Sequence, residues 1–289
     1  MVARLRRNGL LIASLVFLPS CGSGTLRGEP VPIPDTPVAL RRTLAGIESR
    51  KDPEACRARA RIYARLRELE DASSAELLAR GDAADVEVLS QPAPPEFKSE
   101  SAGRLARHFR DRAATPALCR TTLQGPLAAP LRRFVHFTIA AAFGEYSSRG
   151  EQAMALAGLA AAAGEISSAP SLKPEVQRRW QERARQYALR AEDLRSSEEP
   201  REPSPEARAF VEQDFARHLE EAARAADAAT REKAQRGDPE RVLEHYLAAL
   251  SHYVVVRECL PEPSPADEKR LESMELVTRS LTDLLSAER

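Results

Sequence analysis

The chain contains four cysteines, and the first of them has the most informative surroundings. Three arginines stand among residues 1–7, an apolar run extends from Leu10 to Leu18 with a single serine in it, and Cys21 follows. A thiol can stay free, form a disulfide or be acylated. The apolar run is too short for a membrane-spanning helix, which needs about 20 residues. A basic segment followed by a short apolar one is typical of a secretory signal peptide.

Residues Leu18-Pro19-Ser20-Cys21 resemble the lipobox of bacterial lipoproteins, which places an aliphatic and a small residue before an obligatory cysteine. The resemblance implies cleavage between Ser20 and Cys21, a diacylglycerol on the sulfur and an acyl group on the new amino terminus. Two or more lipid chains anchor a protein stably. In such lipoproteins, an Asp after the cysteine retains the protein at the inner membrane. The resemblance therefore implies that Gly22, at this position, favours the periplasmic face of the outer membrane. The alternative is an ordinary signal peptide that leaves Cys21 as a thiol.

The remaining cysteines would then lie in an exported compartment, where disulfides can form. Cys56, Cys119 and Cys259 allow at most one bridge, and we expect each of them to be a small buried side chain on a helix. No cluster of cysteines and histidines has zinc spacing. His245 and His252 are seven residues apart, whereas metal-binding pairs on helices prefer three or four. The sequence therefore predicts neither a metal site nor a cofactor.

Motifs of the common enzyme classes are also missing from the sequence. There is no nucleophile elbow, phosphate-binding glycine loop, H-E-x-x-H pair or dinucleotide fingerprint. Adjacent acids such as Glu220 and Glu221 face different directions on a helix and do not form a catalytic pair. Lysines and arginines number 43, as do the acids, so the net charge is zero and a nucleic-acid partner is not expected. We expect no catalytic residues.

The elements that position these residues are predicted to be helices. Glycine is scarce, and alanine, leucine, glutamate and arginine dominate the composition. Helix starts repeat one pattern, a short polar residue followed by proline and often an acid, at Thr36-Pro37, Asp52-Pro53, Ser204-Pro205, Asp238-Pro239 and Ser264-Pro265. The predicted helices are 38–50, 53–70, 74–80, 99–113, 127–147, 151–163, 174–196, 205–235, 239–259 and 266–287. A short strand is predicted at 85–89.

An Arg-Gly-acid triplet occurs three times, with its glycine at 81, 150 and 237. Small and bulky residues follow the last two glycines at matched offsets: Ala155, Leu159 and Ala162 after Gly150, and Val242, Tyr246 and Ala249 after Gly237. With Tyr146 before Gly150, these positions resemble a tetratricopeptide (TPR) repeat, best in residues 136–169. No regular 34-residue period continues through the chain. We therefore predict an all-α fold, either a degenerate TPR-like array of helical hairpins or an irregular bundle. Ordinary helix ends are another explanation of the triplets.

The sequence divides into a signal peptide at 1–20, a flexible proline-rich tether at 21–37, a helical segment at 38–90 and a main helical domain at 96–289. The first functional hypothesis is a protein-interaction or scaffold module that is held at the membrane by the lipid on Cys21 and binds envelope proteins. The second is a structural or solute-binding bundle with a pocket lined by the alanine-rich residues 127–163. An envelope enzyme is a third.

Overall fold

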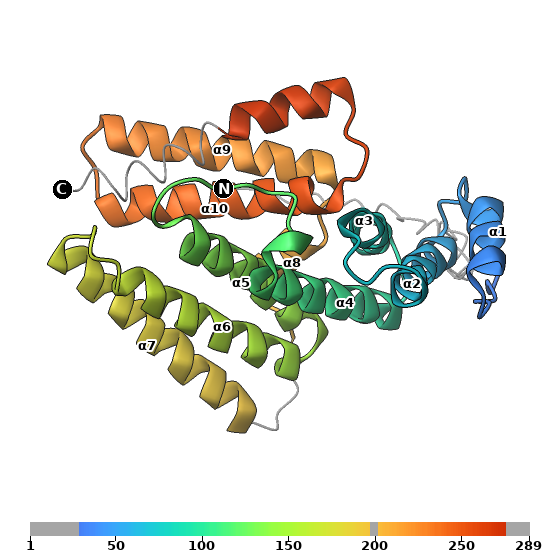
Figure 1. Cartoon of the computed structure of the whole chain (residues 1–289). Coiled ribbons are helices and arrows are strands. Elements are labelled where there is room, and N and C mark those ends of the chain that lie inside the picture. Colours follow the sequence, from blue (N-terminus) through green and yellow to red (C-terminus); the bar gives the residue numbers. More distant parts are fainter. Residues whose placement is uncertain (1–28, 197–201, 276–289) are drawn as a thin grey trace, which may run out of the picture.

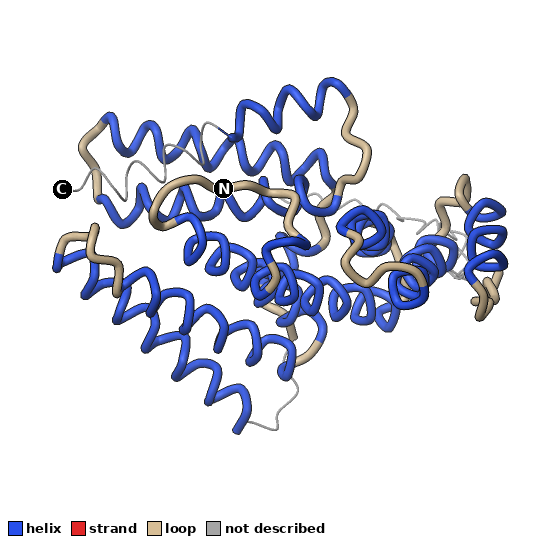
Figure 2. The backbone as a smooth tube through the Cα atoms, viewed as in Figure 1, coloured by secondary structure: helices blue, strands red, loops and turns tan. Residues whose placement is uncertain are grey.

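The computed structural model describes residues 29–196 and 202–275, and these residues are entirely helical or irregular, without a strand (Figure 2). The predicted all-α class is confirmed. The predicted signal peptide and Cys21 lie outside the described residues. The helices are α1 (Pro37–Ile47), α2 (Pro53–Leu69), α3 (Ala75–Ser90), α4 (Pro95–Ala114), the 3-10 helix η1 (Pro116–Leu118), α5 (Ala128–Ser147), α6 (Arg149–Ser167), α7 (Pro174–Ser196), α8 (Pro205–Val211), α9 (Phe215–Ala234) and α10 (Pro239–Cys259). Residues 265–275 are helical as well.

The helix starts predicted from a polar residue before proline are confirmed. A side-chain oxygen accepts a first-turn backbone N–H at 3.0 to 3.4 Å in each of Thr36, Asp52, Ser204 and Asp238. These bonds satisfy N–H groups that have no partner inside the helix, and the following proline has no N–H to satisfy. Local sequence thus determines where four of the helices begin.

The strand predicted at 85–89 and the helix end predicted at residue 80 are wrong, because α3 continues without interruption to Ser90. Gly81 does not end a helix. A Cβ atom at this position would lie only 3.3 Å from Cβ of Tyr63, so the glycine allows α2 and α3 to approach closely. Val86 and Leu89 are three residues apart and both belong to the large core, which is helical rather than strand spacing.

The single helix predicted at 205–235 is also wrong, because the structure has two helices there. α8 ends at Val211, and the Oδ1 atom of Asp214 accepts the backbone N–H of Arg217 at 2.8 Å, which caps a new helix. The break lets α8 pack on α5 while α9 pairs with α10. This short α8 separates the two clefts described below.

Neighbouring helices in the chain pack on one another, α5 on α6, α6 on α7 and α9 on α10, and α1 to α3 extend to one side of this body (Figure 1). α5 is central, since it contacts α4, α6, α8 and α10. A Cβ atom at Gly144 would lie 2.7 Å from the backbone nitrogen of Gln152, and one at Gly158 would overlap the ring of Phe137. Both glycines therefore permit the close α5–α6 contact.

One large hydrophobic core extends from α3 to the helical residues 265–275, and α1 and α2 form a smaller core of their own. The connection between α3 and α4, near the predicted domain boundary, does not divide the large core. Leu89 before this connection and Ala102 after it belong to the same cluster. α3 thus joins the N-terminal helices to the main body.

Candidate functional site

The positions predicted from the TPR resemblance lie on the α5–α6 and α9–α10 hairpins. The bulky and small positions that follow the two glycines are all buried: Ala155, Leu159, Ala162, Val242, Tyr246 and Ala249. Gly237 lies between α9 and α10 as predicted, but Gly150 lies in the first turn of α6 rather than between helices. These residues pack the core, and the finer TPR-like architecture stays a prediction.

Tyr146 and Gly237 each have a specific contact. The half-buried Tyr146 donates its hydroxyl hydrogen to Oε1 of Glu212 at 2.6 Å, which ties α5 to the segment after α8. The left-handed conformation at the end of α9 belongs to Arg236, with φ of 52°, and not to the glycine. A Cβ atom at Gly237 would collide with Glu232. A larger residue at this position would therefore require the Glu232 side chain to move.

An apolar cleft of about 360 Å³ lies between α5, α6, α7, α8 and α10. Small and apolar side chains form most of its wall: Ala141, Ala142, Leu156, Leu159, Ala207, Phe210 and Ala248. Polar groups stand among them, including Glu145, Arg190 and Ser251. Part of this wall comes from residues 127–163, the stretch predicted to line a pocket. Ligand pockets typically have volumes of about 300 to 1,000 Å³ with this mixture of surfaces.

Two histidines stand beside the cleft, and one of them, His252, lines it. The Nδ1 atoms of His218 and His252 are 2.8 Å apart, so one ring donates a hydrogen bond to the other. The ring of Phe210 packs against both. Burial, together with the charge of His252, lowers the pKa of His218 to about 3, and burial lowers the pKa of His252 to about 4. Both rings are therefore neutral near pH 7.

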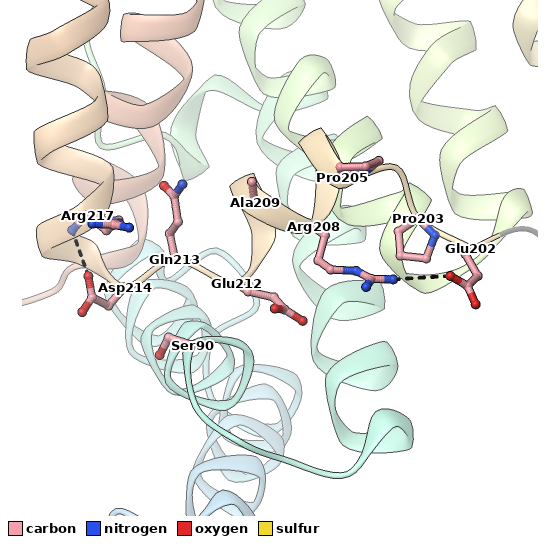
Figure 3. Close-up of a pocket in the computed structure, with 10 residues that line it drawn as sticks. All are labelled: Ser90, Glu202, Pro203, Pro205, Arg208, Ala209, Glu212, Gln213, Asp214 and Arg217. Atoms are coloured by element: carbon pink, nitrogen blue, oxygen red, sulfur yellow. Dashed lines mark hydrogen bonds and ion pairs between the residues drawn. The ribbon is translucent and has the colours of Figure 1, made fainter. Parts of the chain in front are cut away.

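A second cleft of about 850 Å³ borders other residues of α8, and Figure 3 shows its lining. Its side chains are mainly charged and of both signs: Glu202, Arg208, Glu212, Asp214 and Arg217. Glu202 and Arg208 form an ion pair of 3.7 Å across this lining. One short helix thus has an apolar cleft beside Ala207 and Phe210 and a charged cleft beside Arg208.

A cluster of buried charges lies where the end of α10 meets α3, α4 and α5. The guanidinium of Arg112 is fully buried, with Nη1 2.6 Å from Oδ2 of Asp82 and Nε 3.3 Å from Oε2 of Glu258. Nδ1 of His108 is 2.6 Å from the other oxygen of Asp82. Burial raises the pKa of Asp82, but the charges of Arg112 and His108 outweigh it, and the pKa is lowered overall.

The carboxylate of Glu258 connects this cluster to a histidine and a cysteine. It accepts the backbone N–H groups of Arg120 at 2.8 Å and Thr121 at 2.9 Å. Nε2 of His136 lies 3.5 Å from Oε1 of Glu258 and 3.8 Å from Sγ of Cys119. These three side chains come from α10, α5 and the residue after η1.

Opposing effects set the ionisation of this second half of the cluster. Burial raises the pKa of Glu258, but the nearby His136 ring and the charge of Arg112 lower it to about 2. Burial lowers the pKa of His136, but its polar contacts with Cys119 and Glu258 raise it above its usual value overall. Sequence reasoning missed the group, because no local motif contains residues 119, 136 and 258 and only the fold brings them together.

The three cysteines of the described residues are free thiols. Cys56 and Cys259 are buried as predicted, whereas Cys119 is partly exposed and contacts polar groups. Burial raises the pKa of Cys56 to about 11 and the pKa of Cys259 well above its usual value.

No family model matches this chain, and no curated protein or solved structure shows significant similarity to it. Among residues 29–196 and 202–275, we find no helix with the length and apolar character needed to cross a bilayer. The two clefts and the charged cluster are therefore the features from which a function is inferred.

Proposed function

We propose that this protein is a lipid-anchored lipoprotein of the cell envelope whose helical body binds an apolar segment of another envelope protein. The apolar cleft carries this proposal. It is open to solvent, its walls are alanine, leucine and phenylalanine side chains, and five helices fix their positions. Apolar surface that a folded protein leaves open to solvent is favourable to cover, and such surface marks interaction sites.

The occupant that fits best is a peptide segment with apolar anchor residues and charged flanks. Apolar anchors would fill the cleft beside Ala142 and Phe210. Charged flanking residues would meet the mixed charges of the neighbouring cleft, such as Arg208 and Asp214. Buried anchors supply most of the affinity of an interface, whereas charges at its rim mainly set orientation and association rate.

The membrane location in this proposal rests on the sequence alone. A lipid on Cys21 would hold the chain at the membrane, and the residues between Cys21 and Val31, which packs against the core of α1 and α2, would separate the helical body from the lipid surface. Gly22 favours the periplasmic face of the outer membrane. The expected partners are the lipid bilayer, through Cys21, and envelope proteins, through the cleft.

A solute-binding function is the second candidate, and the volume of the same cleft favours it. About 360 Å³ is within the range of small-molecule sites. A small ligand would be enclosed by Ala141, Leu156 and Phe210 and oriented by the polar Ser251 and His252. A molecule that copurifies with the native protein in one copy per chain would support this candidate over a peptide partner.

Photo-cross-linking in intact envelopes tests the cleft directly. A photoreactive residue is placed at Ala142, which lines the cleft, and in a matched control at Ala161, which is exposed on α6 and is not among the cleft residues. We expect the Ala142 site to cross-link one defined segment of one protein, and the control site not to. A synthetic peptide of that segment must then bind the purified protein. Equal cross-linking from both positions, or none from Ala142, would contradict the proposal.

Replacing the predicted lipidated cysteine tests the anchor. The Cys21→Ser variant should move from the detergent phase to the aqueous phase, and metabolic labelling with palmitate should disappear, because no sulfur remains to carry the lipid. A Cys56→Ser control should partition and label as the parent protein does. Unchanged partitioning of Cys21→Ser would refute lipid anchoring.

A further inference from the structure

Cys119, His136 and Glu258 present a sulfur, a nitrogen and an oxygen to one small space. Their potential ligand atoms all lie within 4.8 Å of one another. These are the three atom types that bind zinc in proteins. We propose that these side chains form a zinc site, which is independent of the binding proposed for the cleft.

The orientation of His136 is that of a metal ligand. Its Nδ1 atom is 2.8 Å from the backbone carbonyl oxygen of Arg132, which can only accept a hydrogen bond. Nδ1 therefore carries the hydrogen, and in the neutral ring the lone pair of Nε2 faces Glu258 and Cys119. Histidines that bind metals commonly hold their second nitrogen in this way. The oxygen of Glu258 and the sulfur of Cys119 are electron-rich as well. A cation or a proton must therefore lie between these two atoms and the lone pair of Nε2.

The distances favour an ion over direct contact. Hydrogen bonds between nitrogen and oxygen span about 2.7 to 3.2 Å, whereas Nε2 of His136 and Oε1 of Glu258 are 3.5 Å apart. Ligand bonds of about 2.0 to 2.3 Å around tetrahedral zinc give separations of about 3.3 Å for nitrogen and oxygen and about 3.6 Å for nitrogen and sulfur. The observed 3.5 and 3.8 Å are close to these values, and the sulfur and the carboxylate oxygen lie within 4.8 Å of each other.

Thr121 supplies a second, independent sign of an incomplete site. Its backbone N–H binds Oε1 of Glu258, yet its buried hydroxyl oxygen has no hydrogen-bond partner within residues 29–196 and 202–275. A buried hydroxyl without a partner is costly. The backbone of Thr121 contacts the Glu258 carboxylate, so a water that completes the zinc tetrahedron is one group that could satisfy this hydroxyl.

Two arginines oppose a cation here, and proton release accompanies its binding. Nη1 of Arg132 lies 3.2 Å from Sγ of Cys119, and Arg112 is ion-paired with Glu258. Zinc binds the thiolate form of cysteine and the neutral form of histidine, so any protons that Cys119 and His136 hold leave as the ion enters, and affinity should rise with pH. Cys119 is partly exposed, so this side of the site lies near solvent.

Cobalt and zinc titrations of the full-length chain test this site. A Cys21→Ser background removes the thiol of the predicted anchor, and Co²⁺ reports thiolate ligation by its sulfur-to-metal charge-transfer absorption. We expect one Co²⁺ per chain with this absorption, and displacement by Zn²⁺. Cys119→Ser should abolish the absorption and weaken zinc binding at least about tenfold, since even losing an outer-shell partner costs about 10- to 100-fold. Cys56→Ser, which alters a buried thiol elsewhere, should change neither.

A second measurement does not depend on a variant that folds. Stoichiometric Zn²⁺ should slow alkylation of Cys119 in the parent protein at least about tenfold, because a metal-bound thiolate is a poor nucleophile. Absence of the charge-transfer absorption in the parent, its persistence in Cys119→Ser, or unprotected Cys119 in the presence of Zn²⁺ would each overturn the proposal. The site would then be a thiol–imidazole–carboxylate contact that is bridged by protons.

Discussion

The apolar cleft and the buried charged cluster share the same two helices, α5 and α10. The first half of α5 brings His136 to Glu258 near the end of α10, and the second half brings Ala142 to the cleft beside Ser251. The two regions are thus neighbours along one helix pair. One is apolar and open to solvent, while the other is charged and shielded from it.

The charged cluster is the part of the helix pair that holds the fold together, and the apolar cleft is the part that can bind a ligand. Arg112 is fully buried and pairs with both Asp82 and Glu258, so removing either partner leaves a buried guanidinium with one carboxylate instead of two. Ala142 is partly exposed, and its methyl side chain has no polar atom. Substitutions in the cluster should therefore change stability, whereas substitutions in the cleft should change binding.

The largest effect should come from Glu258→Gln, which we expect to lower the free energy of unfolding by about 3 to 5 kcal/mol, because Arg112 loses a charged partner in a dry environment. Urea denaturation measures it. Glu165→Gln is the matched control, since Glu165 pairs with Arg133 of the same helix α5 at a solvent-exposed site, and it should cost no more than about 1 kcal/mol. Equal effects of the two variants would contradict the special dependence of the fold on the buried Arg112 pair.

The pH dependence of stability should come from the cleft side. The pKa values of His218 and His252 are lowered to about 3 and about 4, so below about pH 6.5 the unfolded chain binds protons that the folded chain does not. Stability should therefore fall from about pH 6.5 to pH 4, by up to about 3 kcal/mol per pH unit for two protons. The raised pKa of His136 stabilises the fold most below about pH 6.5, and this contribution is lost as pH rises.

Replacing His252 should make this acid transition shallower. His252→Gln removes one of the two titrating rings, so the slope of stability against pH should fall by about half. His245→Gln replaces a half-buried histidine two turns earlier on α10 and should keep the full slope. Urea midpoints measured at intervals between pH 4 and 7 give the comparison. An identical slope in the parent protein and in His252→Gln would show that the two histidines do not cause the pH dependence of stability.

How far the sequence predicted this arrangement can be seen at α8. The start of α8 was predictable from Ser204-Pro205, because capping depends only on local residues. The end of α8 was missed, although Asp214 is a recognisable cap inside the apparent helix 205–235. Both clefts depend on that break, and neither could be derived without the packing of α8 on α5.

The sequence predicted even less of the charged cluster. Asp82, Arg112 and Glu258 look like ordinary surface charges in a helical sequence, and nothing local distinguishes them from exposed residues such as Glu165. Their burial results from the contacts of α10 with α3 and α5, which join residues far apart in the chain. Helix type and the helix starts with a polar residue before proline were therefore predictable, whereas the composition of the sites was not.

The three thiols should differ in their rates of alkylation. In the metal-free protein, iodoacetamide should modify the partly exposed Cys119 first, while Cys56 and Cys259 stay protected until the chain unfolds. The raised pKa of Cys56, about 11, alone lowers its thiolate fraction about 100-fold below that of an ordinary cysteine. Peptide mass spectrometry over time measures the three rates. Equal rates would show that Cys56 and Cys259 are as accessible to the reagent as Cys119.

The smallest effect on stability should come from filling the cleft. Ala142→Phe places a ring in a space open to solvent and should change the free energy of unfolding by less than about 1 kcal/mol. Ala161→Phe adds the same ring on the exposed face of α6 and should behave similarly. Urea denaturation of both variants would confirm that either can serve in a binding measurement.

The affinity of these two variants for the cross-linked partner segment tests the central claim most directly. Calorimetric titration of a synthetic peptide of that segment should show at least about tenfold weaker binding to Ala142→Phe than to the parent protein, because the ring occupies the space of an apolar anchor. Ala161→Phe should bind as the parent does. Unchanged affinity in Ala142→Phe would contradict binding in the cleft.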